Sequence, residues 1–492
     1  MLSTTAQKSE ELKSIFVYPK EKRNLDPMTD RKKFDVVVIG AGPGGYVAAI
    51  KAAQLGKSVA VIEKNLLGGT CLNVGCIPTK TLLANASILH QVKRAADFGI
   101  TTGPISIQYE KMKARKDQVI AKIRSGLEGL IKSNKITIFI GTASFEKPHE
   151  LKVMGQDNLF ISADKIIIAT GSIPTDIKAF PCDHDRILNS TSILELTEVP
   201  KTLAIVGGGY IGCEFASLFA ELGTKVTILE MLDSILKPQG PTVSQFMTKA
   251  LTQRGIEIRT GVKVLYIENQ KHQAHIKLDS GMVAADYALV SVGRRVYTEG
   301  LSLEKAGLPL NAKGCIDVND KMETEVPGIY AIGDVTGDPM LAHVASHEGT
   351  IAAINACGGD ALMHYESVPA VIFTSPEVAT VGMTLEMAQE KGYQTTVGTF
   401  PFQALGKSQA AMETEGFSQI IADKKTGQVL GAIIIGHEAS NLIAQMALAI
   451  QQELTLESIL ETIHAHPTVA EIWHEAAALA LGMPIHLPPK RI

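Results

Sequence analysis

Two cysteines five positions apart, Cys71 and Cys76, lie in the glycine-rich segment Gly68–Lys80. This spacing lets one sulfur lie in a loop and the other at the start of the following helix, close enough to bridge. Because a helix N-terminus lowers a thiol pKa, the reduced pair would hold a reactive thiolate. Two buried structural cysteines are the alternative. Zinc is disfavoured because no second cysteine pair or Cys/His cluster accompanies them, so we expect no metal site.

A second candidate for proton chemistry is the run from His464 to Trp473. Its H-x-H pattern is a weak hint of metal binding. His466 could act as a base if Glu471 holds its imidazole and raises its basicity. A structural role competes with this, because Thr468 is a good N-cap residue and Glu471 stands at the capping-box position. The spacing leaves both interpretations open.

The elements before the cysteine pair predict a nucleotide site. Residues 34–39 form a β-branched run typical of a buried parallel strand, and an Ala-rich helix and a second strand follow. The first strand is followed by a G-x-G-x-x-G motif (Gly40, Gly42 and Gly45), and the second strand ends at an acid, Glu63. The glycines let backbone approach a pyrophosphate, the helix N-terminus faces its charge, and the acid can bind ribose hydroxyls.

The same pattern recurs later in the chain, with Gly207, Gly209, Gly212 and Glu230. The first glycine and the acid are 23 residues apart in both copies. Matching spacing in full strand–helix–strand context predicts two dinucleotide sites. Glu230 would repel a ribose 2′-phosphate, and no Lys or Arg follows until Lys237. The second ligand should therefore be NAD rather than NADP.

Further apolar strands end in small or acidic residues that could border these cofactors. One closes on Thr170 and Gly171, and its counterpart in the second copy closes on Gly293. The run Ile329–Asp334 predicts another buried strand whose terminal Asp accepts from a polyol hydroxyl, although a turn or cap role is equally compatible. Near Ala342 a long Ala-rich helix opens.

Composition limits the remaining possibilities. A chain of 492 residues predicts about three domains, and 47 basic against 51 acidic residues (net −4) give no sign of nucleic-acid or membrane-surface binding. No apolar run is long enough to cross a bilayer. Six cysteines with one close pair suit a cytosolic protein. Residues 1–33 are charged and lack apolar periodicity, so we expect a mobile extension, with Met28 a possible natural start.

Together these segments resemble the flavoprotein disulfide reductases over residues 34–482. Within that family, the runs 291–301 and 464–468 are most similar to members that reoxidise lipoyl groups of 2-oxo-acid dehydrogenase complexes. Glu230 agrees, since glutathione reductases favour NADPH and carry basic residues there. Val296 where Pro is common, Thr79 where Ser is common, and the N-terminal extension depart from the family pattern. None of these three departures falls on a residue that would take part in the chemistry.

The resemblance implies an α/β fold with two Rossmann-like dinucleotide-binding domains, for FAD and NAD, and an α+β C-terminal dimerisation domain. The expected regions are an extension (1–33), an FAD domain (34–185), an NAD domain (186–299), a central domain completing the flavin site (300–368) and a dimer-interface domain (369–492).

The resemblance also assigns roles. Cys71 is the interchange thiol that meets substrate, Cys76 lies against the flavin, and His466 with Glu471 serves the partner subunit's cysteine pair in a homodimer. Lys80 is similar to the family's flavin lysine, and Glu214 to the glutamate that pairs with it. The FAD site then comprises Gly40, Gly42, Gly45, Glu63, Lys80, Thr170, Gly171, Asp334 and Ala342, and the NAD site Gly207, Gly209, Gly212, Glu214, Glu230 and Gly293.

The implied partner is the lipoyl-bearing acyltransferase of a 2-oxo-acid dehydrogenase complex, or the glycine cleavage system. The implied location is the bacterial cytoplasm, or alternatively the mitochondrial matrix. Two other hypotheses remain: another disulfide or metal-ion reductase on the same core, and a docked structural subunit with a vestigial redox site. Mercuric reductases usually add a C-terminal cysteine pair, whereas this chain ends in Leu-Pro-Pro-Lys-Arg-Ile.

Overall fold

The computed structural model describes residues 30–488 and divides into two compact units. The first combines the residues up to Glu198 with Val292–Met363, and the second combines Val199–Ser291 with the residues from His364 onward. Most of the expected N-terminal extension, as far as residue 29, lies outside the described residues. The first strand begins at Arg31, inside the expected extension.

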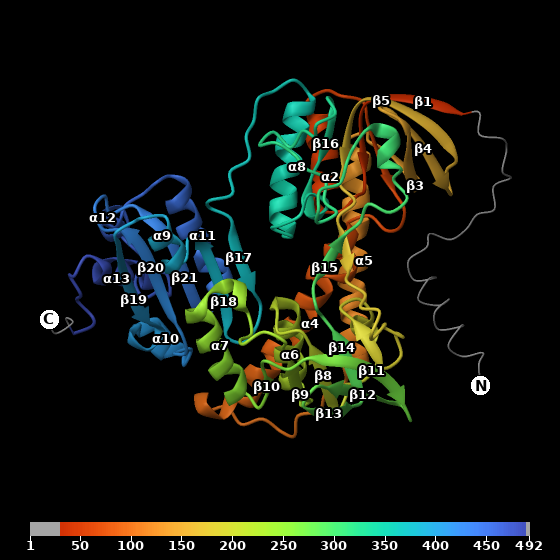
Figure 1. Cartoon of the computed structure of the whole chain (residues 1–492). Helices are drawn as coiled ribbons and strands as arrows, with labels where there is room; N and C mark the ends of the chain where they lie inside the picture. Colours follow the sequence, from red (N-terminus) through yellow and green to blue (C-terminus); the bar gives the residue numbers. More distant parts are fainter. Residues whose placement is uncertain (1–29, 489–492) are drawn as a thin grey trace. The chain divides into compact units, whose positions relative to one another are not determined.

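A mixed six-stranded sheet organises the first unit (Figure 1). Its parallel part runs in the order β3-β2-β1-β5-β16, and the outer halves of β3 and β5 pair antiparallel with β4. The strands are β1 (Arg31–Ile39), β2 (Val59–Glu63), β3 (Thr137–Lys147), β4 (Glu150–Gly155), β5 (Leu159–Ile168) and β16 (Ile329–Ala331). The last four residues of β1 (36–39) and all of β2 are buried in the sheet, as expected for apolar parallel strands.

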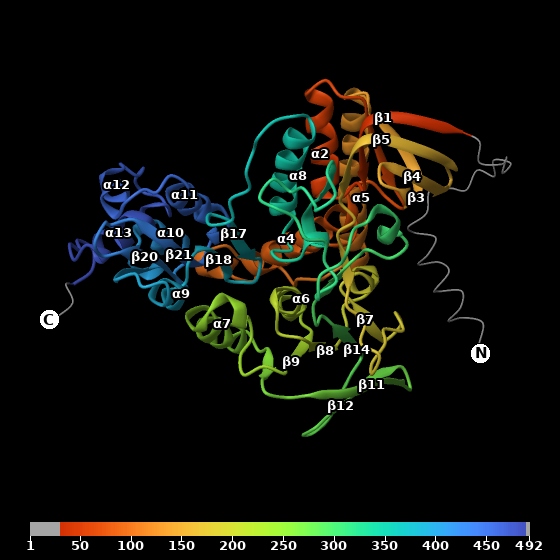
Figure 2. The same cartoon turned by 45° about the horizontal axis from the view of Figure 1, so that its top comes forward.

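Two helices from distant parts of the sequence lie side by side on this sheet, α2 (Pro43–Gln54) and α8 (Ala342–Ala356) (Figures 1 and 2). Their backbones approach closely where both carry glycine, because a Cβ on Gly349 would lie 2.5 Å from the carbonyl oxygen of Gly44. This contact joins the first nucleotide-binding motif to a helix three hundred residues later in the chain.

The cysteine segment forms two consecutive helices rather than a loop followed by a helix. Cys71 lies in α3 (Gly69–Val74), and Cys76 is the first residue of α4 (Cys76–Lys93). The expectation of a loop position for the first sulfur is therefore wrong, whereas the expected helix start for the second is confirmed. The unit also contains the long helix α5 (Tyr109–Ser133), the antiparallel ribbon of β6 (Ser172–Pro174) and β15 (Arg294–Val296), and the strand β7 (Ile187–Asn189).

The second unit repeats the nucleotide-binding architecture. Its parallel strands run in the order β10-β9-β8-β14, the same arrangement around the first glycine strand as in the first unit. They are β8 (Thr202–Val206), β9 (Lys225–Leu229), β10 (Glu257–Arg259) and β14 (Tyr287–Val290), accompanied by α6 (Tyr210–Glu221), α7 (Pro241–Gln253) and the antiparallel strands β11 (Val264–Gln270), β12 (Gln273–Leu278) and β13 (Gly281–Ala285).

The C-terminal part of this unit is an antiparallel sheet in the order β17-β18-β21-β20-β19, packed against α11 and α13. Its strands are β17 (Pro369–Ile372), β18 (Glu377–Gly382), β19 (Thr395–Pro401), β20 (Phe417–Asp423) and β21 (Val429–Gly436). Its helices are α9 (Leu385–Glu390), α10 (Gly406–Ala411), α11 (Ala439–Gln451), α12 (Leu456–Glu461) and α13 (Glu471–Ala480). Trp473 is fully buried between sheet and helices. The predicted α/β class, with two Rossmann-like domains and an α+β C-terminal domain, is confirmed.

Candidate active site

The two sulfurs of Cys71 and Cys76 are in hydrogen-bond contact, and both residues are partly buried. The pKa of Cys71 lies well above its ordinary value, chiefly because its thiol donates to the Cys76 sulfur, and also because it is buried and faces the Cys76 charge. Lys80, one turn after Cys76 on α4, opposes this by lowering the Cys71 pKa. The raised pKa favours a protonated Cys71 in the reduced pair, and the Cys76 sulfur that accepts from it lies at the N-terminus of α4.

Residues that sequence reasoning missed brace this pair. Asn73 donates to the carbonyls of Leu67 (3.0 Å) and Gly69 (2.9 Å), and Arg124 on α5 donates to the Asn73 side chain at 3.0 Å. Asn73 lies between the two cysteines in the sequence, and this position is the one sequence feature that could have indicated its role. These bonds fix α3 against the preceding turn and hold the Cys71 sulfur at its place beside Cys76.

Tyr46, directly after the last motif glycine, was also missed. Burial raises the pKa of Tyr46, and the proximity of the Cys71 thiol adds to this. The first glycine loop and the cysteine pair are therefore neighbours within one unit. A nucleotide cofactor held by that loop would lie close to the sulfurs.

The two glycine loops have the same close contacts. A Cβ on Gly45 would lie 2.0 Å from the Gly40 carbonyl oxygen, and a Cβ on Gly212 would lie 2.1 Å from that of Gly207. The middle glycines differ: a Cβ on Gly42 meets only Gly69 at 4.0 Å, and one on Gly209 meets nothing within 4 Å. The last glycine of each motif thus lets helix pack on strand, and the middle one leaves open space.

The terminal acids also act alike in both copies. Glu63 accepts from the backbone N–H groups of Ala41 and Asn65, each at 2.8 Å. Glu230 accepts from those of Gly208 (2.6 Å) and Leu232 (2.7 Å). Burial raises the pKa of Glu63 despite these bonds. Each acid therefore ties its strand end to the glycine loop. The sequence had predicted only that these acids bind ribose.

Both loops fit a dinucleotide pyrophosphate. The helices α2 and α6 begin with Gly42 and Gly209 as N-caps, neither receives a side-chain cap, and neither has an acid in its first turn. The positive ends of their dipoles thus face the open space at the middle glycine, where an anion could bind. FAD in the first unit and NAD in the second match this chemistry.

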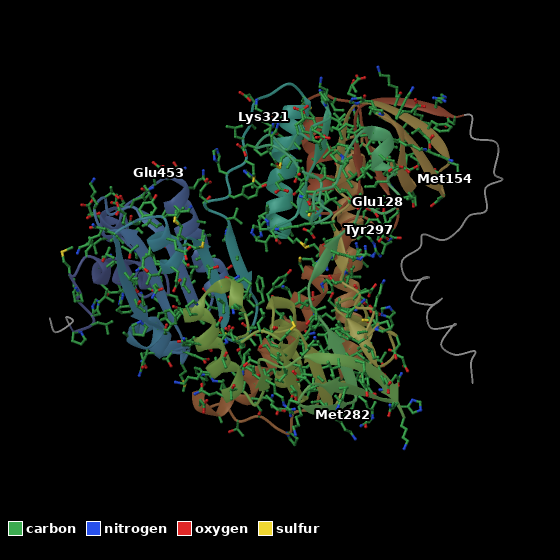
Figure 3. The ribbon with its side chains drawn as sticks, viewed as in Figure 1. Glu128, Met154, Met282, Tyr297, Lys321 and Glu453 are labelled. Atoms are coloured by element: carbon green, nitrogen blue, oxygen red, sulfur yellow. The ribbon has the colours of Figure 1, made fainter. Side chains whose placement is uncertain are left out.

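The remaining residues assigned to FAD gather at the carboxyl ends of the first unit's strands. Thr170 donates to the carbonyl of Tyr297 at 2.6 Å, and Gly171 accepts from the Tyr297 N–H at 2.9 Å; Tyr297 is labelled in Figure 3. Ala342 begins α8, which lies beside α2. The sequence placed Asp334 at a strand end. It lies instead in a 3₁₀ turn, Gly333–Thr336, because β16 stops at Ala331.

Ser172 and Arg294 hold Asp334, a cluster that no local pattern signalled. The Ser172 hydroxyl donates to the Asp334 carboxylate, and the Arg294 guanidinium donates to the Ser172 hydroxyl at 2.7 Å and to its carbonyl at 2.8 Å. An anchored carboxylate of this kind can accept from a cofactor hydroxyl.

Two residues assigned to NAD have other observed partners. Glu214 is buried on α6 and accepts from the backbone N–H of Phe373 at 3.0 Å. Gly293 belongs to the first unit, where its carbonyl accepts from Thr175 at 3.1 Å. The pairing of Glu214 with Lys80 and the contact of Gly293 with NAD stay predictions.

His466 and Glu471 are paired as the functional interpretation predicted. The imidazole Nδ1 lies 2.9 Å from one oxygen of Glu471, and the other oxygen accepts from the Thr468 N–H at 2.9 Å. Burial alone would raise the pKa of Glu471, but the Thr468 and His466 bonds outweigh it and leave the pKa below its ordinary value. The expected capping box does not form, because α13 begins at Glu471 with Ala470 as its N-cap, and the Thr468 hydroxyl donates to Ala465.

A second His–Glu pair, which the sequence analysis missed, uses another glutamate of α13 and a histidine that follows the helix. His486 Nδ1 is 2.6 Å from the carboxylate of Glu475, which is buried one turn after Glu471 on α13. Among the described residues no three His, Cys, Asp or Glu side chains gather where they could hold a metal ion. Within residues 30–488 no helix is long and apolar enough to cross a membrane.

Comparison with known proteins identifies the family to which this chain is similar. Residues 34–349 match the family described as pyridine nucleotide-disulphide oxidoreductase, and residues 368–477 match its dimerisation domain, which supports a homodimer. Curated relatives include the dihydrolipoyl dehydrogenases of Chlamydia pneumoniae (49% identical, 93% of this chain and 99% of the relative) and Geobacillus stearothermophilus (42%, covering 93% and 98%).

Solved structures of similar fold come from the same group. LpdA from Mycobacterium tuberculosis has a TM-score of 0.86 at 26% identity, covering 91% of this chain and 99% of that one. The flavoprotein disulfide reductase RclA from Escherichia coli has a TM-score of 0.82 at 30% identity, with the same coverage.

Proposed function

This chain belongs to the pyridine nucleotide-disulphide oxidoreductase family, and we propose that within it the protein acts as a dihydrolipoyl dehydrogenase. It uses FAD and NAD, and it oxidises protein-bound dihydrolipoamide while NAD⁺ is reduced to NADH. The near full-length similarity to enzymes of that name supports the assignment.

The observation that carries the proposal is the cysteine pair itself. The Cys71 thiol donates to the Cys76 sulfur, which lies at the start of α4 with Lys80 one turn away. Such a pair, once oxidised, is a disulfide that a substrate dithiol can reduce by exchange. The neighbouring glycine loop suits FAD, which when bound supplies the electron relay between dithiol and NAD⁺.

The proposed role of His466 is to take a proton from one thiol of dihydrolipoamide. That substrate thiolate attacks the Cys71 sulfur, the Cys71–Cys76 bond breaks, and Cys76 leaves as a thiolate. The second substrate thiol then attacks the sulfur that is bound to Cys71. This releases the oxidised lipoyl disulfide and leaves Cys71 holding a proton, the state that the hydrogen bond to Cys76 favours.

The homodimer brings a second copy of each site. We assign His466 and Glu471 to the partner subunit's cysteine pair, in agreement with the family resemblance. The macromolecular partner is then the lipoyl-bearing acyltransferase of a 2-oxo-acid dehydrogenase complex, or the glycine cleavage system. The bacterial relatives favour the cytoplasm over the mitochondrial matrix as the place of work.

We also infer the division of labour along the chain: FAD binding by residues 34–185, NAD binding by 186–299, completion of the flavin site by 300–368, and dimerisation by 369–492. The FAD and NAD assignments are supported by the two glycine loops, which have matching close contacts and matching acid-to-backbone bonds.

A steady-state comparison tests the proposal. The holoprotein is assayed for NAD⁺ reduction by dihydrolipoamide and, in parallel, for NADPH oxidation by glutathione disulfide. We expect the first reaction to dominate by several orders of magnitude. A protein that reduces glutathione disulfide with NADPH, or mercuric ion, faster than it oxidises dihydrolipoamide would contradict the assignment.

A further inference from the structure

The chain that leaves β9 folds back against the second glycine loop. The N–H of Leu236 donates to the Gly208 carbonyl at 2.9 Å. A Cβ on Gly208 would lie 2.7 Å from the Ile235 side chain, so the segment packs directly on the loop. Lys237 follows Leu236 directly and therefore lies beside the loop that would hold the adenosine half of the dinucleotide.

Lys237 is the first basic residue after Glu230, and it is engaged by an acid. Its ammonium nitrogen lies 2.9 and 3.0 Å from the two carboxylate oxygens of Asp233. Asp233 also accepts from the Ser234 hydroxyl at 3.0 Å. Both members are open to solvent, with 50% of the Lys237 side chain and 75% of the Asp233 side chain exposed.

A basic side chain near the ribose is what accommodates a 2′-phosphate in folds of this kind. Lys237 directly follows the residue that bonds the glycine loop, and both carboxylate oxygens of Asp233 accept from its ammonium group. We propose that Asp233 is a specificity-determining residue: by pairing with Lys237 it denies that ammonium group to the 2′-phosphate of NADPH. The inference deepens the proposed function by naming what, besides Glu230, excludes the phosphorylated cofactor.

Asp233 allows a cleaner test than Glu230. Glu230 holds the backbone of Gly208 and Leu232, so its removal disturbs the loop as well as the charge. The Asp233 carboxylate instead accepts from the Ser234 and Lys237 side chains and from its own backbone N–H. Replacing Asp233 therefore changes the charge balance at the ribose and leaves the hydrogen bonds of the glycine loop in place.

The test is a double-mutant cycle on the holoenzyme: wild type, Asp233→Asn, Lys237→Met and the double variant. The first readout is the ratio of kcat/KM with NADPH to kcat/KM with NADH, using ferricyanide as acceptor. The second is the ratio of dissociation constants for 2′,5′-ADP and 5′-AMP, which differ only in the 2′-phosphate. Glu128→Gln is the matched control, since Glu128 (Figure 3) forms an exposed i,i+4 pair with Lys132 on α5.

We expect Asp233→Asn to shift both ratios about 5-fold toward the phosphorylated ligand, the size of an exposed charge interaction. The shift should vanish when Lys237→Met is added, and Glu128→Gln should show none. Unchanged ratios in Asp233→Asn would overturn the inference, as would a shift of equal size with and without Lys237. Neither readout involves dihydrolipoamide, so a failure of the proposed substrate leaves this test intact.

Discussion

The Nδ1 of His466 donates to the carboxylate of Glu471 at 2.9 Å, and the second oxygen of that carboxylate accepts from the Thr468 N–H at 2.9 Å. The Glu471 carboxylate thus contacts both the imidazole and the Thr468 backbone, the two partners that the alternative sequence interpretations gave it. Because Nδ1 carries the hydrogen, Nε2 of the neutral ring is the acceptor. The exposed imidazole, 76% accessible, therefore presents its basic nitrogen outward.

This geometry predicts the effect of His466→Gln. We expect dihydrolipoamide oxidation to fall by ~10²-fold or more, the usual contribution of a positioned base. Oxidation of NADH by an artificial acceptor needs no thiol deprotonation and should largely survive, as should the dimer. Loss of both activities together would indicate a structural role at the interface, and retention of both would mean that another group takes the proton.

His486→Gln is the matched control for this variant. It removes an exposed imidazole that pairs through Nδ1 with a carboxylate on the same helix, Glu475. If the loss in His466→Gln reflects base chemistry, the control should keep dihydrolipoamide turnover. An equal loss in both variants would assign the effect to the packing of α13.

Glu471 predicts an acid-dependent stability difference. Its folded-state pKa lies below the ordinary value, so its contribution is present above about pH 4.3 and is lost as pH falls through the folded pKa. Glu471→Gln should unfold at a lower temperature than wild type near pH 7, by about 1 kcal/mol of stability, and the gap should close below about pH 4. Thermal unfolding across pH measures it. A gap that stays constant down to about pH 3 would exclude this linkage.

The glycine contacts predict two different outcomes within one motif. Gly45→Ala places a Cβ 2.0 Å from the Gly40 carbonyl oxygen, so helix and strand must separate at a cost of about 1–3 kcal/mol or more. We expect little flavin to be retained. Gly42→Ala meets only an atom at 4.0 Å, so the protein should fold while its affinity for FAD falls. Flavin content and unfolding temperature distinguish them; normal flavin content in Gly45→Ala would refute the contact.

Glu230 should set most of the preference for NADH. Glu230→Ala removes the carboxylate that repels a 2′-phosphate, and we expect the NADH preference to narrow by about 10-fold. It also removes the acceptor of the Gly208 and Leu232 N–H groups, so KM for NADH should rise. Kinetics with both cofactors measure each effect. Equal activity of the wild type with NADPH and NADH would contradict the premise.

Features with a local pattern were predictable from the sequence. The two glycine motifs, the acids 23 residues after each first glycine, and the start of α4 at Cys76 follow from short-range spacing. The strand β18 (Glu377–Gly382) directly follows Pro376, a residue that usually indicates a break, so no local pattern marks where it begins.

Contacts between distant residues could not be predicted in the same way. Ser172 and Asp334 are 162 positions apart, and no periodicity links them. Glu63 and Glu230 were predicted to bind ribose, and they also accept from backbone N–H groups of their glycine loops. These bonds depend on the direction of the N–H groups in the folded loop, which no sequence pattern gives. The helical position of Cys71 depends on the left-handed turn at Gly68, with φ of 96°, and on the Asn73 bonds that follow it.

The central claim is that Cys71 meets the substrate and Cys76 faces the flavin. Anaerobic addition of dihydrolipoamide to the holoprotein, followed by NAD⁺, tests it most directly, with Cys71→Ser and Cys76→Ser alongside wild type. We predict a long-wavelength thiolate-to-flavin absorption in the wild type that NAD⁺ discharges as NADH forms. Cys71→Ser should show such a band without added substrate, and Cys76→Ser should never show it. Identical spectra from the two variants, or no NADH from the wild type, would contradict the account.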